Sequence, residues 1–271
     1  MSIHSEIKKV TTSSFKKMKA TGEKISMLTA YDYTIAKLAD EAGLDAILVG
    51  DSAANVMAGY ETTLPITLDQ MIYHAQCVSR GIKRAMLIVD LPFGTYQSDP
   101  MQAYRSAVRI MKETGAAAIK MEGGIEIKDS IEAIVKAGIP VMGHLGLTPQ
   151  SIHHFGSFKL RAKENEEADK LIADAKLLED IGCFSVTLEK IPALLAEKVT
   201  KELQIATIGI GAGNLTDGQV LVIHDILGLN KNFKPKFARK YINLHEQIVE
   251  VVSQYIKDVK SQEFPNKDES F

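Results

Sequence analysis

Eight short apolar runs follow one another along this sequence, and helix-like segments separate most of them. The runs cover residues 24–31, 45–50, 85–90, 117–121, 140–144, 183–188, 205–208 and 220–223. Such runs, bounded by turn residues, are typical of strands buried on both faces of a parallel sheet. The segments 33–42, 68–80, 100–114, 128–137, 164–180 and 192–202 have helical apolar spacing, and a glycine follows most of them. The alternation predicts an α/β protein.

Eight strand–helix repeats in a chain of 271 residues match the ~250 residues typical of a closed (β/α)8 barrel, the TIM barrel. A doubly wound open sheet has the same alternation and is the structural alternative. We expect a single-domain barrel over residues 25–260, in which residues 234–260 form one or two further helices packed on the outside. Residues 1–24 are expected to form an arm or short helix, and residues 261–271 a polar tail.

The composition excludes several classes of protein. The formal net charge of −2 gives no basic field that would attract nucleic acid or an anionic membrane. No apolar run approaches the ~18 residues of a membrane span, and the N-terminus lacks the apolar core of a signal peptide. The two cysteines, Cys77 and Cys183, lie far apart in apolar surroundings, which is typical of a reducing compartment. We therefore expect a cytoplasmic protein that has neither nucleic acid nor a membrane as its partner.

Three consecutive strand-like runs end in a carboxylate. Asp51 follows the second run, Asp90 ends the third, and Glu122 ends the fourth. An α/β barrel carries its chemistry at the carboxyl ends of its strands, so these side chains are expected to meet at one rim. A hard cation such as Mg²⁺ binds oxygen ligands and needs only one or two carboxylates besides water and substrate. The pattern predicts a divalent metal site, whereas any one of these residues alone could be a simple helix cap.

Lys120 and Glu122 lie two residues apart and therefore face the same side of a strand. A lysine buried beside a carboxylate and a metal is costly unless it binds an anion. We expect Lys120, with the Ser52 hydroxyl, to bind a substrate carboxylate. A surface Lys–Glu pair is the alternative interpretation.

His144 ends the fifth run, and Glu189 follows the sixth. An imidazole at that rim is suited to hold substrate or metal-bound water, although a histidine can also be a core residue. A partly shielded carboxylate at a strand end is suited to act as a general base, so Glu189 is the candidate. The glycine-rich loop 209–213 has the composition of a barrel phosphate site, and a plain tight turn explains it equally well.

At this point the motifs become specific enough to resemble a known family. The matching segments are TAYDY (29–33), LVGDS (48–52), TLPIT (63–67), DLPFGTY (90–96), IKMEGG (119–124), GHLGLTPQS (143–151), IGIGAGNLTDGQVLV (208–222) and HDILGL (224–229). In this order they resemble the 3-methyl-2-oxobutanoate hydroxymethyltransferases, also called ketopantoate hydroxymethyltransferases. The chain departs from the usual family pattern at Ala53 and Ala54, at Tyr60, in the loop 156–162 and at Lys190.

The resemblance implies a Mg²⁺-dependent barrel enzyme of pantothenate synthesis, and a homodecamer built from pentameric rings. Such an enzyme transfers a hydroxymethyl group from 5,10-methylenetetrahydrofolate to 3-methyl-2-oxobutanoate and gives 2-dehydropantoate. Asp51, Asp90 and Glu122 match the family's metal positions, Glu122 through a water molecule, and Glu189 matches its proton acceptor. We expect Asp51, Ser52, Asp90, Lys120 and His144 to contact the oxo acid. No residue is assigned to the folate.

Two other functions remain open. The segment YD…GLDAILVGDS also resembles the phosphoenolpyruvate mutase and isocitrate lyase superfamily, whose barrels hold 2-oxo acids with Mg²⁺. The lyases of that group carry a reactive cysteine in a glycine-flanked loop, whereas Cys77 falls in an expected helix and Cys183 opens an expected strand. A catalytically silent barrel would have lost polar groups at the rim, and this sequence retains them.

Overall fold

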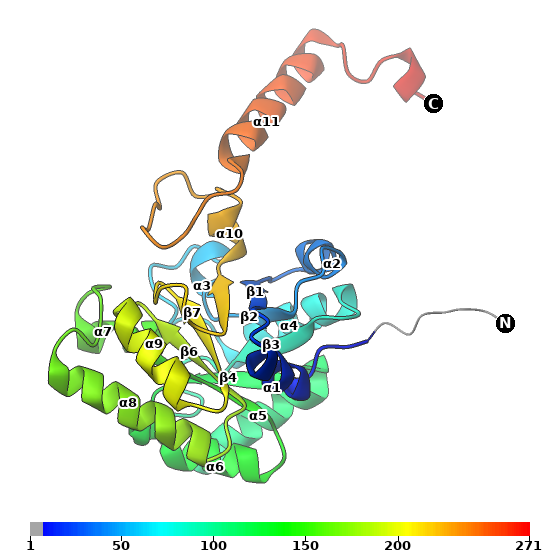
Figure 1. The fold of residues 1–271 in the computed structure, drawn as a ribbon. Coiled ribbons are helices and arrows are strands. Elements are labelled where there is room, and N and C mark those ends of the chain that lie inside the picture. The colour runs from blue at the N-terminus through cyan, green and yellow to red at the C-terminus, as the bar shows by residue number, and fades with distance from the viewer. Residues whose placement is uncertain (1–7) are drawn as a thin grey trace. The chain divides into compact units, whose positions relative to one another are not determined.

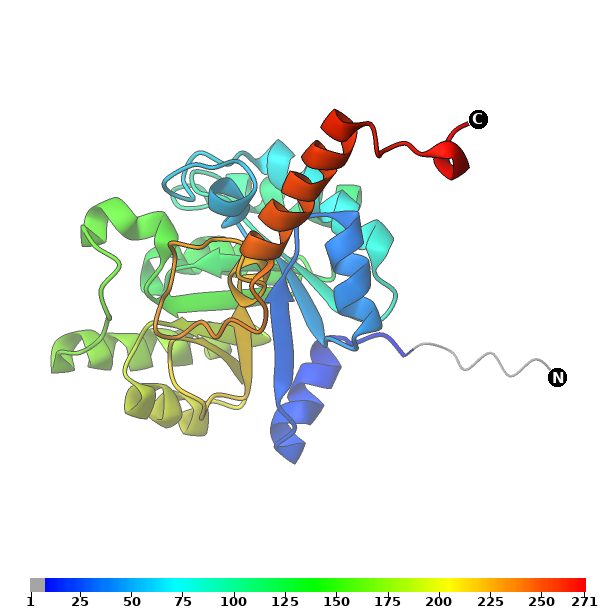
Figure 2. The same ribbon diagram turned by 90° about the horizontal axis from the view of Figure 1, so that it is seen from above.

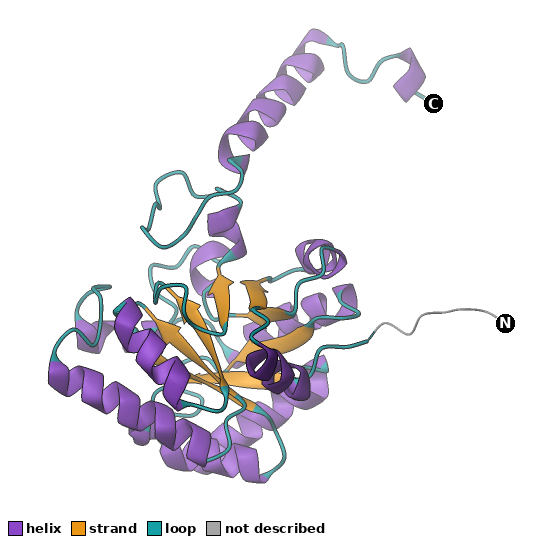
Figure 3. Ribbon diagram, viewed as in Figure 1, coloured by secondary structure: helices purple, strands orange, loops and turns teal. Residues whose placement is uncertain are grey.

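The computed structural model describes residues 8–271, and eight parallel strands in it form a closed barrel in sequence order (Figures 1 and 3). The strands are β1 (Ile25–Thr29), β2 (Ala46–Val49), β3 (Met86–Asp90), β4 (Ala118–Glu122), β5 (Val141–Gly146), β6 (Ser185–Glu189), β7 (Ala206–Ile210) and β8 (Gly218–Leu221). The first and last strands pair in parallel, with Met27 opposite Val220. This pairing confirms the predicted (β/α)8 barrel and excludes the open sheet.

Six helices alternate with the strands and surround them, as the view from above shows (Figure 2). They are α2 (Tyr33–Glu41), α4 (Leu68–Gly81), α5 (Pro100–Thr114), α6 (Lys128–Lys136), α8 (Asn165–Asp180) and α9 (Ala193–Glu202). Their ends lie within one or two residues of the predicted ones, because local caps fix them. Thr67 and Gln70 form a capping box on α4, and the Asp99 side chain accepts a hydrogen bond from Met101 N at the start of α5.

The N-terminal helix α1 (Thr12–Thr21) packs against the amino end of the barrel. Its Phe15 and Met18 join a buried cluster with residues near the start of the strands, and the Phe15 ring meets the Phe184 ring edge-on at 5.5 Å. Lys19 Nζ also lies 2.7 Å from Asp217 Oδ2, on the segment that leads into β8. Apolar packing and this half-buried ion pair therefore close the amino end and leave the carboxyl end for chemistry.

Short helices that the sequence analysis did not predict lie in the loops after β2, β4 and β5. They are α3 (Ala53–Val56), η1 (Ile125–Ile127), η2 (Pro149–Ser151) and α7 (Ile152–Phe155). Each has three or four residues, too few for an apolar period to be read from the sequence. All of them follow the carboxyl ends of strands, so they shape the rim where the predicted site residues lie.

Residues 223–271 form a separate compact unit with α10 (Ile223–Ile226), α11 (Leu244–Ser261) and η3 (Lys267–Glu269). The helix expected to begin near residue 234 begins only at Leu244, so that boundary was wrong. Residues 227–243 form turns and irregular backbone, and Asn230, Asn232 and Pro235 among them are residue types that favour turns. In the part of the chain that the structure covers, no helix combines the length and apolarity needed to cross a membrane.

Candidate active site

The predicted site residues meet at the carboxyl end of the barrel. Asp90, Lys120, Glu122 and His144 belong to neighbouring strands, and pairing places Asp90 beside Lys120 and Glu122 beside His144. Asp51 directly follows β2. Between 2 % and 6 % of the surface of each of these five residues is exposed. They are therefore interior groups of the barrel mouth, which argues against the surface-pair interpretation of Lys120 and Glu122.

Four polar contacts connect Asp90, Lys120, Glu122 and His144 and extend the group to Glu189. Lys120 Nζ lies 2.7 Å from Asp90 Oδ1 and 3.3 Å from His144 Nδ1. The same His144 nitrogen lies 3.2 Å from Glu122 Oε1, and His144 Nε2 lies 3.3 Å from Glu189 Oε2. Lys120 and His144 thus join carboxylates from three strands, β3, β4 and β6. We call Asp51, Asp90, Lys120, Glu122, His144 and Glu189 the rim cluster.

Asp51 and Ser52 reach the rim cluster through a tight turn after β2. The Asp51 backbone N–H donates to Asp90 Oδ2 at 3.0 Å, and the Ser52 hydroxyl lies 2.8 Å from the buried Tyr31 hydroxyl. Gly50 permits this turn, because a Cβ there would lie only 2.8 Å from Ser52 Oγ. A side chain in place of this glycine would therefore displace the Ser52 hydroxyl from its position beside Tyr31.

The rim cluster concentrates negative charge in a buried place. Burial raises the pKa of Asp51 well above its usual value, and repulsion from Glu122 and Asp90 adds to the effect. Burial also raises the pKa of Asp90, although the neighbouring Lys120 ammonium opposes it. Burial lowers the pKa of Lys120, but attraction to Asp90, Glu122 and Asp51 outweighs it and raises the pKa. The cluster therefore holds its lysine charged, whereas burial and mutual repulsion favour the protonated forms of Asp51 and Asp90.

His144 is the second positive group of the rim cluster. Burial and the Lys120 charge lower its pKa, but the contacts with Glu122 and Glu189 outweigh both and raise it to about 9. Burial raises the pKa of Glu122, and the His144 and Lys120 charges outweigh it, so that this pKa is lowered. A protonated His144 therefore holds the carboxylates of β4 and β6 in place at neutral pH.

The donor set fits a hard divalent cation with few protein ligands. Among residues 8–271 there is no preformed group of three His, Cys, Asp or Glu side chains arranged to hold a metal. Mg²⁺ keeps several waters and needs only one or two carboxylates. Asp51 and Asp90 supply these, and the raised pKa values of both show that a further positive charge would stabilise their ionised forms. Asp51 and Asp90 would hold the ion.

Two buried residues of the site were missed by the sequence analysis. Gln150 Nε2 donates to Asp51 Oδ2 at 2.9 Å, and the Gln150 backbone N–H donates to Glu122 Oε2 at 2.9 Å. The Tyr96 hydroxyl lies 2.7 Å from Gln150 Oε1 and accepts a bond from the Glu122 backbone N–H at 3.0 Å. Both come from loops, so no strand-end pattern marked them. The sequence offered one sign of them, namely that each is a polar residue within a segment that matches the family.

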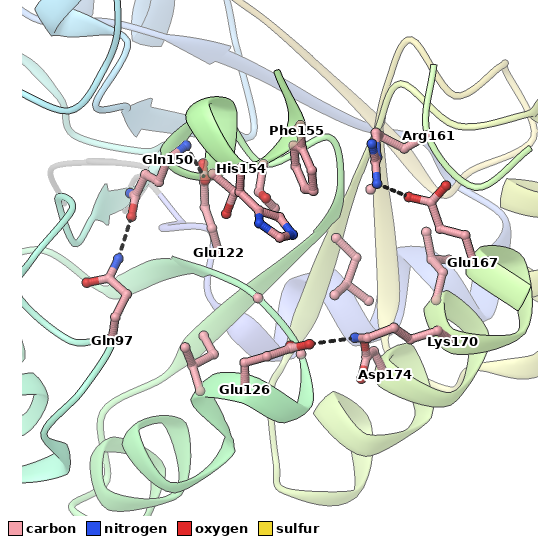
Figure 4. Close-up of a pocket in the computed structure, with 18 of the residues that line it drawn as sticks. Gln97, Glu122, Glu126, Gln150, His154, Phe155, Arg161, Glu167, Lys170 and Asp174 are labelled. Atoms are coloured by element: carbon pink, nitrogen blue, oxygen red, sulfur yellow. Dashed lines mark hydrogen bonds and ion pairs between the residues drawn. The ribbon is translucent and has the colours of Figure 1, made fainter. Parts of the chain in front are cut away.

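A cavity of about 450 Å³ adjoins the rim cluster (Figure 4). Glu122 and Gln150 form one side of it. The remaining walls come from η1, α7 and α8, together with residues of the β3–α5 loop and the segment after α7. Strand-end reasoning did not predict this cavity, because its walls belong to loops and helices.

The chain matches a family model and many curated relatives over nearly its whole length. The model described as "Ketopantoate hydroxymethyltransferase" matches residues 9–267. A protein of Flavobacterium johnsoniae named 3-methyl-2-oxobutanoate hydroxymethyltransferase is 64% identical over 266 residues, which cover 98% of each chain. One of Cytophaga hutchinsonii with the same name is 65% identical over 267 residues, again covering 98% of each.

Solved structures with the same fold come from a different group. A phosphonopyruvate hydrolase has a TM-score of 0.63 at 11% identity, covering 96% of this chain and 90% of its own. A phosphoenolpyruvate phosphomutase from Streptomyces platensis subsp. rosaceus has a TM-score of 0.63 at 12% identity, covering 93% and 88%. These similarities show the barrel fold alone. The family model and the relatives above 60% identity decide the family and confirm the prediction of a transferase, so this chain belongs to the ketopantoate hydroxymethyltransferase family.

Proposed function

We propose that this enzyme transfers a hydroxymethyl group to 3-methyl-2-oxobutanoate and forms 2-dehydropantoate, as the names of its relatives indicate. The proposed donor is 5,10-methylenetetrahydrofolate, and the proposed pathway is the synthesis of pantothenate and coenzyme A. The observation that carries the proposal is the buried rim cluster, in which a charged lysine, two candidate metal carboxylates and a candidate base share one set of contacts.

The oxo acid carboxylate is assigned to Lys120 and Ser52. Lys120 is buried beside three carboxylates that keep it charged, and a substrate anion would share that charge. The Tyr31 hydroxyl lies 2.8 Å from the Ser52 hydroxyl and holds it in position by a hydrogen bond. When bound at Asp51 and Asp90, Mg²⁺ supplies Lewis-acid polarisation of the keto group, which acidifies the neighbouring C–H bond. His144 and Glu122 complete the lining, with Glu122 in the more distant metal position that the family resemblance implies.

Glu189 is assigned the role of proton acceptor. Its side chain is 17% exposed, and its Oε2 atom lies 3.3 Å from His144 Nε2, which orients the carboxylate. Glu189 removes the C3 proton of the oxo acid, and the electrons of that bond pass into the enolate. The enolate carbon then forms a C–C bond with the one-carbon unit of the folate. Both C–N bonds of the methylene group break, and water supplies the hydroxyl oxygen and the hydrogens that the two tetrahydrofolate nitrogens gain. The proton taken up by Glu189 passes to the new hydroxyl group, and tetrahydrofolate leaves.

Self-association and a cytoplasmic setting complete the proposal. None of the eighteen residues of α11 is buried, and its apolar side chains include Ile248, Val252, Tyr255 and Val259. An exposed apolar helix face is typical of a protein interface, and it supports the homo-oligomer, a homodecamer, that the resemblance implies. Cys77 and Cys183 are free thiols, which suits a reducing cytoplasm.

The test of the function is a reconstitution with defined components. Purified enzyme is incubated with the oxo acid, Mg²⁺ and tetrahydrofolate carrying a ¹³C-labelled methylene group. We expect ¹³C-labelled 2-dehydropantoate by NMR, loss of activity after dialysis against EDTA, and recovery when Mg²⁺ is returned. Turnover of the oxo acid without any folate would instead favour chemistry of the phosphoenolpyruvate mutase type, and the transfer proposal would be wrong.

A further inference from the structure

We propose that the cavity beside the rim cluster binds the pterin end of the reduced folate; this inference rests on the folate dependence proposed above. The sequence analysis assigned no residue to the folate, and this cavity provides a place for it. The cavity lies among the β3–α5 loop, η1, α7 and α8, and Figure 4 shows its labelled side chains arranged around a common space.

The position of the cavity is the first argument. Glu122 lines it and also contacts His144, while Gln150 lines it and also bonds Asp51. A ligand in the cavity would therefore adjoin the group of residues assigned to the oxo acid. Transfer of a carbon unit requires the donor and the acceptor to lie in contact. The space next to Glu122 and Gln150 meets this requirement.

The size and walls of the cavity are the second argument. A volume of about 450 Å³ lies within the ~300–1,000 Å³ of small-molecule sites. Phe93 and Phe155 supply aromatic surface, and the Arg161 guanidinium lies 4.0 Å from the Phe155 ring centroid. Flat heteroaromatic rings stack well on such surfaces. Gly146 also lines the cavity, and it packs so closely on the next strand that a Cβ there would lie 2.2 Å from Glu189 O.

The polar groups of the cavity are the third argument. The edge of a pterin offers amino and ring N–H donors beside one carbonyl acceptor. Glu126, Glu167 and Asp174 line the cavity with carboxylates, and Lys170 lies 2.9 Å from Glu126 and 2.5 Å from Asp174. One lysine shared by two carboxylates leaves oxygen lone pairs that can accept the pterin donors.

The fourth argument is the Arg161 guanidinium, which lines the cavity. One of its nitrogens pairs with Glu167 at 2.5 Å, and its Nε atom forms no hydrogen bond in the described structure. A guanidinium carries five N–H donors, so the pair with Glu167 leaves donors for an acceptor such as the pterin carbonyl. Three carboxylates against Arg161 and Lys170 also disfavour a phosphate or nucleotide in this place.

Binding of tetrahydrofolate itself, measured anaerobically by equilibrium dialysis, tests the inference. The variants are Phe155→Leu, which removes a stacking surface, and Glu126→Gln, which replaces an exposed carboxylate by an isosteric amide. Phe158→Leu is the matched control, because Phe158 is an exposed aromatic residue of the following segment that does not line the cavity. Removal of one stacked ring predicts about a ten-fold weaker affinity, while the control keeps the wild-type affinity.

Exchange of the C3 hydrogen of the oxo acid for deuterium, without folate, is the second readout. We expect all three variants to exchange at the wild-type rate, because the cavity is not assigned to the oxo acid. Wild-type tetrahydrofolate affinity in both cavity variants would overturn this inference and leave the proposed function intact. Absence of tetrahydrofolate binding to the wild-type enzyme would overturn the folate donor and the inference with it. Slow exchange in the cavity variants would contradict the separate pterin site.

Discussion

Gln150 connects the two carboxylates that stand on either side of the proposed metal site. Its side-chain amide donates to Asp51, its backbone N–H donates to Glu122, and only 6% of its surface is exposed. The Tyr96 hydroxyl and Gln97 Nε2 both lie within 2.9 Å of Gln150 Oε1 and fix the orientation of the amide. Gln150 therefore positions Asp51 for an ion without being a ligand itself.

Replacement of Gln150 by leucine tests this role. We expect Gln150→Leu to weaken Mg²⁺ binding ~10–100-fold, the usual effect of losing a residue that orients a metal ligand. The free energy of unfolding should fall by about 1–3 kcal/mol, because the Asp51 carboxylate loses a buried donor. Calorimetric titration with Mg²⁺ and chemical denaturation measure the two effects.

Gln97→Leu is the matched control for that experiment. Gln97 donates to Gln150 Oε1 and accepts from the Gly94 backbone N–H, and in the described structure it forms no hydrogen bond with either carboxylate of the site. We expect Gln97→Leu to keep a Mg²⁺ affinity close to that of the wild type, because the buried Tyr96 hydroxyl still holds the Gln150 amide. Equal Mg²⁺ affinity in Gln150→Leu and the wild type would show that Gln150 does not position the ligand.

Residues at strand ends could be placed from the sequence, whereas residues in loops could not. Asp90 and Glu122 follow apolar runs, and a parallel barrel brings every such end to one rim. Gln150 occupies a 3₁₀ turn six residues beyond His144, and the path of that turn depends on contacts with β3 and β4. No local sequence pattern encodes that path, so the predicted site lacked Gln150, which links Asp51 to Glu122.

At the scale of elements, helices with strong local signals were predicted well. Asp32, Thr67 and Asp99 cap α2, α4 and α5 through their side chains, and each directly precedes a segment that was predicted to be helical. The short helices α3 and α7 depend on tertiary contacts and were missed. The packing of the C-terminal helices on the outside of the barrel stays a prediction.

At the scale of elements, the testable prediction is that the apolar side of α11 takes part in self-association. At 100° per residue, Val252 and Val259 lie near the centre of its apolar side, and Gln254 lies on the polar side. Buried charge opposes association, so we expect Val252→Lys combined with Val259→Lys to lower the molar mass measured by light scattering. Gln254→Lys is the control and should leave the mass unchanged. If the double variant kept the molar mass of the wild type, α11 would not be part of the interface.

At the scale of the whole barrel, stability and chemistry occupy opposite ends. Phe15 and Met18 of α1 fill the amino end with apolar contacts, and no residue of the rim cluster lies there. Buried charged groups gather at the carboxyl end. Burying them costs folding free energy, and such groups are typical of sites that bind a ligand. The proposed reaction therefore depends on one step, in which Glu189 removes the C3 proton of an oxo acid held beside Lys120.

Exchange of that C3 hydrogen for deuterium, followed by NMR without folate, tests this step most directly. Glu189→Gln keeps the shape of the side chain and removes the base, so Mg²⁺ and oxo acid should bind nearly as in the wild type. The exchange rate should fall by ~10²–10⁴-fold, the usual contribution of a general base. Exchange at the wild-type rate in Glu189→Gln would contradict the account and make His144 the next candidate for the base.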